Sequence, residues 1–157
     1  MKLNQLHTPH LNSREVKPTQ SLDERNKKAA ESLSPRYDLL NQKWHEAEKK
    51  LKAMQSPRHV QIVYMEEDSS SGFTILHCLG LVKHRGEWRL CLSSHSNDEQ
   101  QGPEVDWKPV IECAAEERVA AAPFILKLRE EIVLSAEQFV AKVDDAVQKL
   151  TESLKQF

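Results

Sequence analysis

Glycine is scarce in this sequence: the 157 residues include only 4 glycines, too few for a glycine-rich loop that cradles phosphate. No stretch approaches the ~18 consecutive apolar residues of a transmembrane helix, and the first residues lack the apolar run of a signal peptide. The three cysteines are an odd number, are widely spaced and form no Cys-x-x-Cys pair, which is unlike a secreted disulfide framework. We therefore expect a cytoplasmic protein of one-domain length with no membrane association.

The signatures of common enzymes are also missing. The sequence has no G-x-S-x-G, no H-E-x-x-H and no phosphate-binding loop. A cysteine nucleophile needs a base beside it, and the nearest set is Cys78 or Cys91 with His77, His84 or His95. Both cysteines fall in the middle of predicted strands, where side chains are usually packed. The sequence thus favours a protein without catalytic residues and without a cofactor.

Histidine and cysteine together do not predict a metal site. His77 and Cys78 are adjacent, so in a strand their side chains point to opposite faces. Cys91 and His95 are four residues apart, which in a strand separates their Cα atoms by ~13 Å, too far for two ligands of one zinc ion. We expect no metal, and we interpret the cysteines as small buried hydrophobes.

The net charge of -2 hides an uneven distribution. Residues 1–58 hold twelve Lys and Arg against seven Asp and Glu, whereas residues 59–157 hold ten against seventeen. A basic arm on an acidic body can bind nucleic acid, and a second basic group surrounds a predicted hairpin turn. Lysines that alternate with glutamates are, however, typical of a solvated helix face. Nucleic-acid binding is therefore the least favoured of our hypotheses.

The first third of the chain reads as helical. Residues 1–20 show no periodic pattern and predict a flexible tail. Ser21 and Glu24 have capping-box spacing, which predicts a helix over 22–33. The Ser34-Pro35 pair is a second start signal and predicts a separate helix over 35–55.

The second predicted helix carries the sharpest pattern in the sequence. Its apolar residues alternate spacings of four and three, as in the seam of a coiled coil. They are Leu33, Tyr37, Leu40, Trp44, Ala47, Leu51 and Met54. Such residues usually form a core, and aromatic ones are also enriched at interfaces. We assign Tyr37, Leu40, Trp44 and Leu51 as candidate partner-binding residues.

The period then changes to two. Alternating residues predict strands over 59–65, 73–83 and 88–94, with a glycine turn between the last two. Helix resumes over 114–155, with breaks expected near 123 and 135. This order predicts an α+β fold, in which a three-stranded antiparallel meander packs against N-terminal helices and a long C-terminal helix.

The predicted middle strand is apolar on both faces. One face would hold Ile75, His77, Leu79 and Leu81, and the other Leu76, Cys78, Gly80 and Val82. A sheet with one solvated face alternates cleanly, so something must cover the second face. A symmetric dimer is the favoured explanation, and a strand covered on both sides within one monomer is the alternative.

These observations favour a small protein-interaction or assembly module that associates with itself. The first alternative is a small-ligand-binding protein or an enzyme that uses the sheet face, with His77, Trp88 and Cys91 near a pocket. The second alternative is nucleic-acid binding through the basic N-terminal region and the hairpin tip.

Overall fold

The computed structural model describes residues 19–97 and 105–157. The chain divides into two compact units, Met1–Arg36 and Tyr37–Phe157. Most of the predicted tail, residues 1–18, lies outside the described residues. In the first unit the predicted capping box is confirmed, because the Glu24 amide donates to Ser21 Oγ (3.2 Å) and the Ser21 amide donates to Glu24 Oε2 (3.3 Å).

Helix α1 is continuous over Leu22–Lys52. The prediction of two helices divided at Ser34-Pro35 is therefore wrong. Proline lacks a backbone N–H, so one carbonyl of the preceding turn loses its hydrogen-bond donor. Because residues around Pro35 are exposed, water can donate a hydrogen bond to that carbonyl instead. The four-three spacing that crosses Pro35 agrees with the continuous helix.

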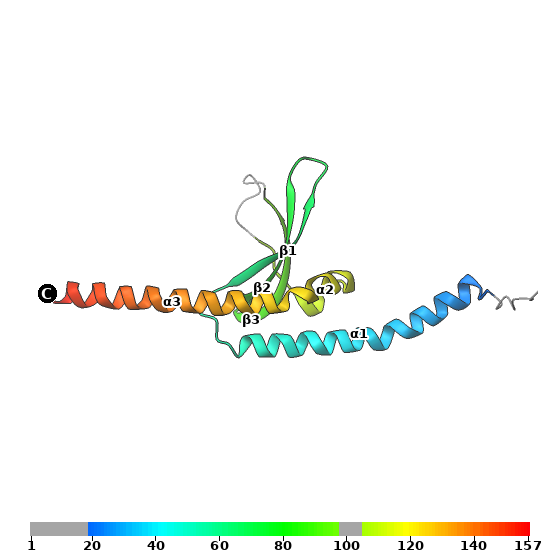
Figure 1. Ribbon diagram of the computed structural model, residues 1–157, viewed down its shortest axis with the longest axis horizontal. Helices are drawn as coiled ribbons and strands as arrows, with labels where there is room; N and C mark the ends of the chain where they lie inside the picture. The colour runs from blue at the N-terminus through cyan, green and yellow to red at the C-terminus, as the bar shows by residue number, and fades with distance from the viewer. Residues whose placement is uncertain (1–18, 98–104) are drawn as a thin grey trace, which may run out of the picture. The chain divides into compact units, whose positions relative to one another are not determined.

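The second unit contains a four-stranded antiparallel sheet, not the three-stranded one expected (Figure 1). The strands are β1 (Val60–Asp68), β2 (Thr74–His84), β3 (Glu87–Ser96) and β4 (Lys108–Pro109), in that spatial order. The two-residue β4 pairs with Cys91 and Leu92. It is too short to show an alternating pattern in the sequence.

The turn between β2 and β3 fixes the register of the hairpin. Arg85 and Gly86 both have positive φ, 51° and 87°, as a two-residue type I′ turn requires. His84 therefore pairs with Glu87, and Leu79 pairs with Leu92. The register places Leu79 and Leu81 of β2 and Leu90 and Leu92 of β3 on one face of the sheet.

Helices cover that leucine-rich face. The helical elements after β4 are η2 (Val110–Glu112), α2 (Ala115–Ala121), η3 (Ala122–Phe124) and α3 (Ile125–Leu154). The core combines residues of α1, the sheet and α3, and it includes Trp44, Leu51, Val60, Ile62, Leu79, Leu81, Leu90, Leu92, Leu128 and Ile132. The α+β class and the long C-terminal helix are thus as predicted. No helix in residues 19–97 and 105–157 has the length and apolarity needed to cross a bilayer.

The second face of the sheet is buried inside the same chain. Cys78 and Cys91 are both 0% exposed, and Val82 is 1% exposed. The indole of Trp107 lies over Gly80, where an added Cβ would come within 2.9 Å of Trp107 Cη2. The expectation that a second chain covers these positions is therefore wrong, because a tryptophan from the segment before β4 fills the space that glycine leaves.

Between residues 115 and 154 the helical segment is interrupted at Pro123 and is continuous after it. Pro123 falls in η3, between α2 and α3, so the break expected near 123 is confirmed. The break expected near 135 is wrong, since Ser135 lies within α3. Instead of capping a new helix, the buried Ser135 Oγ accepts a hydrogen bond from Arg58 Nε at 2.7 Å.

Candidate functional site

Helix α3 has two halves with different surroundings. Leu128, Ile132 and Ser135 are buried against the rest of the second unit. All residues from 137 to 157, by contrast, are exposed. In Figure 1 this stretch of α3 extends away from the sheet to the C-terminus. The same helix therefore anchors in the core at one end and presents a free surface at the other.

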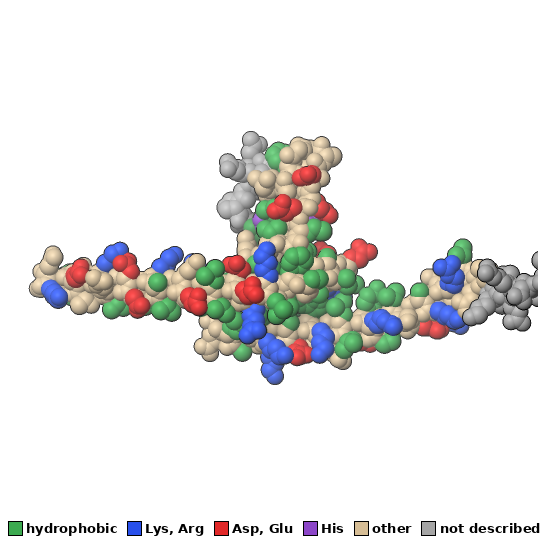
Figure 2. Space-filling view, viewed as in Figure 1, with side chains coloured by type: hydrophobic (Ala, Val, Ile, Leu, Met, Phe, Trp, Pro, Cys, Tyr) green, Lys and Arg blue, Asp and Glu red, His purple; other side chains and the backbone are tan. Residues whose placement is uncertain are grey.

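The free half of α3 carries an apolar seam. Its members are Ala136, Val140, Val143, Val147, Leu150, Leu154 and Phe157, whose spacings alternate between four and three residues. This is the a/d pattern of a coiled coil. Val140 and Leu150 are 60% and 63% exposed. Figure 2 shows hydrophobic side chains interspersed with charged ones along this stretch.

The opposite side of this helix is polar. Lys149 forms an ion pair with Asp145 at 2.7 Å, and Gln148 donates to Glu152 at 3.3 Å. Such pairs add only ~0.2–0.5 kcal/mol each to a helix. Most helix stability in proteins comes from packing of an apolar face, and this part of α3 has its apolar face exposed.

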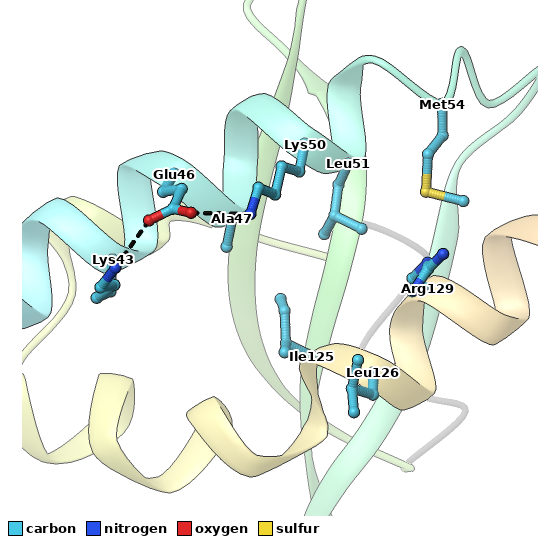
Figure 3. Close-up of a pocket in the computed structure, with 9 residues that line it drawn as sticks. All are labelled: Lys43, Glu46, Ala47, Lys50, Leu51, Met54, Ile125, Leu126 and Arg129. Carbon is cyan, nitrogen blue, oxygen red and sulfur yellow. Dashed lines mark hydrogen bonds and ion pairs between the residues drawn. The ribbon is translucent and has the colours of Figure 1, made fainter.

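A second surface is a cleft of about 580 Å³ between α1 and the start of α3, which we call the helix cleft (Figure 3). Its apolar lining comes from Ala47, Leu51 and Met54 on one side and from Ile125 and Leu126 on the other. A smaller hollow of about 140 Å³ continues it toward Leu40, Trp44 and Ala122. The volume lies in the range of small-molecule sites.

The rim of the helix cleft is cationic. Lys43 and Lys50 both bind Glu46, at 3.0 and 2.8 Å, and their hydrogen bonds lower the pKa of that carboxyl to about 2. Glu46 is therefore ionised at neutral pH and neutralises part of the lysine charge. Arg129 adds a third cation from α3, and in Figure 3 its guanidinium reaches toward the cleft. An apolar lining with an excess of positive charge favours an apolar ligand that carries an anionic group.

The candidate partner-binding residues gather at this cleft. Leu51 lines the cleft itself, and Leu40 and Trp44 line its smaller extension. Trp44 is only 4% exposed, and its indole N–H has no hydrogen-bond partner among the described residues. Tyr37 precedes them on the same seam but is 40% exposed. The seam of α1 is therefore mostly core, and only part of it borders open space.

The candidate ligand-binding residues are not brought together. His77 binds Ser94 Oγ (2.7 Å) and Glu67 Oε2 (3.1 Å) on the leucine-rich face of the sheet. Trp88 lies on the same face but pairs with Lys83 near the turn, and its ring meets the edge of His59. Cys91 pairs with Gly80 on the opposite face. His77, Trp88 and Cys91 therefore do not line a common pocket.

The cysteines are poorly suited to nucleophilic chemistry. All three thiols are free and buried. Burial raises the pKa of the Cys91 thiol to about 12 and that of Cys113 to about 11, and it also raises the pKa of Cys78. These groups stay protonated at neutral pH, whereas the thiolate is the nucleophile. Across the described stretches, no three His, Cys, Asp or Glu side chains are grouped as metal ligands.

The sequence contained the signal for the α3 seam, but periodicity alone does not distinguish a buried seam from an exposed one. The helix cleft had no comparable signal, because it depends on how α1 and α3 lie across the core. Comparison of the chain with family models, with curated proteins and with solved structures found no match.

Proposed function

We propose that this protein is a non-catalytic assembly module that forms a homodimer through the exposed seam of α3. The observation that carries the proposal is the exposed half of α3, residues 137–157, with its uninterrupted four-three apolar spacing. Within α3 the seam runs from Ala136 to Leu154 and spans about 27 Å, at 1.5 Å per residue. A second copy would present the same stripe, so the two helices can cover each other symmetrically.

The residues of the seam fit a two-stranded coiled coil. The a positions hold Val140, Val147 and Leu154, and the d positions hold Ala136, Val143, Leu150 and Phe157, so valine at a is followed by leucine at d in one heptad, Val147 to Leu150. Valine at a with leucine at d favours two parallel strands. The flanking g positions hold Phe139, Ala146 and Ser153, none of which is charged. A parallel pair would therefore bring no like charges together at its g and e positions, since one side of each g–e contact is neutral.

Substitution of Leu150→Glu tests the seam. The change places a carboxylate in the proposed interface of both chains and removes two buried leucines, which we expect to weaken dimerisation by about 3 kcal/mol or more, a rise of at least ~100-fold in Kd. Light scattering after gel filtration measures the mass of wild type and variant at equal concentration. The variant should elute as a monomer where the wild type is a dimer.

Gln148→Glu is the matched control, because it introduces the same side chain two residues away on the polar side of α3. This control should remain dimeric. Equal masses for both variants and the wild type would contradict the proposal. Circular dichroism of each protein shows whether the sheet and core remain folded.

A second candidate function is binding of an apolar anion in the helix cleft. Its support is the combination of five apolar side chains with Lys43, Lys50 and Arg129 around one opening. Dodecanoate is a suitable probe, and dodecyltrimethylammonium is its oppositely charged counterpart. We expect saturable binding of dodecanoate alone, weakened about 10-fold by Arg129→Gln, since a charge-assisted hydrogen bond contributes ~1.5 kcal/mol or more.

Calorimetry below the critical micelle concentration measures both ligands. Lys142→Gln, on the free half of α3, controls for a general loss of positive charge. Equal binding of the two detergents, or an Arg129→Gln variant that binds like the wild type, would contradict this function.

A further inference from the structure

Strand β1 has a free edge. In the sheet order β1-β2-β3-β4 it is the outermost strand, and among the described residues it pairs only with β2. Its other side therefore presents backbone N–H and C=O groups that no neighbouring strand uses. Edges of this kind are templates for pairing with another extended segment.

A groove follows this edge, and we call it the edge groove. One part, of about 470 Å³, is lined by six consecutive residues of β1, Gln61 to Glu66, together with Lys127 and Glu131 of α3. Successive side chains of a strand point to opposite faces. The register of β1 shifts between Val63 and Met65, but Gln61, Ile62 and Val63 before the shift already belong to both faces of the strand. A hollow lined by residues of both faces lies along the edge of the strand and not above one face.

The edge groove continues to the start of β1. A second part, of about 320 Å³, is lined on the strand side by residues 58–61 and on the helix side by Glu131, Leu134, Ser135 and Gln138. The two parts share Gln61 and Glu131. The wall residues of α3 recur every three or four positions, so they form one continuous helix face. The groove therefore runs between a free strand edge and a helix.

The positively charged side chain of Arg58 lies at one end of the edge groove. Arg58 joins the two walls, because its Nε donates to Ser135 Oγ at 2.7 Å and its Nη2 donates to Gln138 Oε1 at 3.1 Å. A guanidinium has five N–H donors, and no described residue accepts a hydrogen bond from its Nη1. The side chain is thus held in place by α3 while donors remain available at the end of the groove.

We propose that the edge groove binds the carboxyl-terminal segment of a peptide in extended form. The peptide adds a strand antiparallel to β1 and places its terminal carboxylate against Arg58. Backbone hydrogen bonds to the free edge supply most of the contacts, and the guanidinium supplies a charge-assisted hydrogen bond to the terminal carboxylate, which is weaker when that end is a neutral amide. Residues 58–66 extend over roughly 25 Å at about 3.3 Å per residue, room for about seven peptide residues.

A peptide end fits this groove better than a second copy of β1. β1 ends in Glu66, Glu67 and Asp68, and the chain continues beyond it. A second copy of β1 paired to this edge would therefore place no terminal carboxylate against Arg58. The site and the dimer seam overlap along the chain, since the groove uses α3 residues up to Gln138 and the seam begins at Ala136, but they share no residue. The inference does not depend on the proposed dimer.

The experiment starts from a random heptapeptide library with free carboxyl ends, screened against the full chain. The best peptide is then synthesised twice, as the acid and as the terminal amide, and each is titrated by fluorescence polarisation. We expect the acid to bind at least ~10-fold more tightly than the amide, since loss of a charge-assisted bond costs ~1.5 kcal/mol or more. Hydrogen exchange should show new protection of amides in β1 when the acid is bound.

Arg58→Gln should remove the difference between acid and amide, and Arg58→Lys should keep part of it. Because the ratio is taken within each protein, a modest loss of stability in either variant does not hide the result. Lys142→Gln, which also removes one positive charge from α3 but lies outside the edge groove and the helix cleft, should preserve the wild-type ratio. Failure to select any peptide, equal affinities of acid and amide for the wild type, or protection of β1 amides by self-association without peptide would overturn the inference.

Discussion

At the scale of single residues, one carboxylate joins α1 to the sheet. Glu48 accepts hydrogen bonds from Arg89 Nε at 3.1 Å and from the Leu90 amide at 2.9 Å. Since β4 pairs only with Cys91 and Leu92, the Leu90 amide lies on the part of β3 that β4 does not reach. Glu48 is therefore the hydrogen-bond acceptor for the Leu90 amide at the sheet edge and for the half-buried guanidinium of Arg89.

We predict that Glu48→Ala lowers the free energy of unfolding by about 1–3 kcal/mol, because a partly buried amide and a guanidinium lose their acceptor. Chemical denaturation measures the change. Glu46→Ala is the control on the same helix, since Glu46 binds two exposed lysines at the surface, where ion pairs contribute little. A loss for Glu46→Ala as large as that for Glu48→Ala would contradict this account.

Gly80 is the residue that lets Trp107 close the second face of the sheet. We predict that Gly80→Ala destabilises the protein by about 1–3 kcal/mol, because its Cβ would be forced against the indole and against the Val60 carbonyl oxygen at 3.0 Å. The same substitution in a Trp107→Leu background should cost less, and a double-mutant cycle by thermal denaturation measures the coupling. Additive effects of the two changes would argue against the contact.

At the scale of elements, the sequence predicted what depends on local periodicity. The hairpin, the long C-terminal helix and the capping box at Ser21 all rest on neighbouring residues. Predictions failed where local signals competed with the wider structure. Ser34-Pro35 was predicted to start a new helix, but α1 continues through it. Ser135 was predicted to break α3, but it lies within the helix and accepts a hydrogen bond from Arg58. The cover of the second face came from Trp107, a residue whose place no periodicity predicts.

The candidate site shows the same division. The four-three spacing along the C-terminal helix was visible in the sequence, but its exposure beyond residue 136 was not. In α1 the same spacing predicted a seam, of which Trp44 and Leu51 are now core residues that also border the helix cleft. The edge groove could not be predicted, because it arises where the free side of β1 meets a helix from much later in the chain.

At the scale of the second unit, three surfaces remain open around one core: the α3 seam, the helix cleft and the edge groove. They use different residues and different chemistry. The seam is apolar and repeats along a helix, the cleft is apolar with a cationic rim, and the groove offers a strand edge that ends at Arg58. Each surface therefore has a separate substitution that tests it: Leu150→Glu, Arg129→Gln and Arg58→Gln.

The central claim is that the α3 seam joins two copies of the chain. Sedimentation equilibrium of the 157-residue chain tests it most directly, because the method reports mass in solution without a label or a partner. At micromolar concentration we predict twice the chain mass of 18.0 kDa and a return to the single-chain mass in the Leu150→Glu variant. A wild-type protein that remains at 18.0 kDa across the micromolar range would contradict the account.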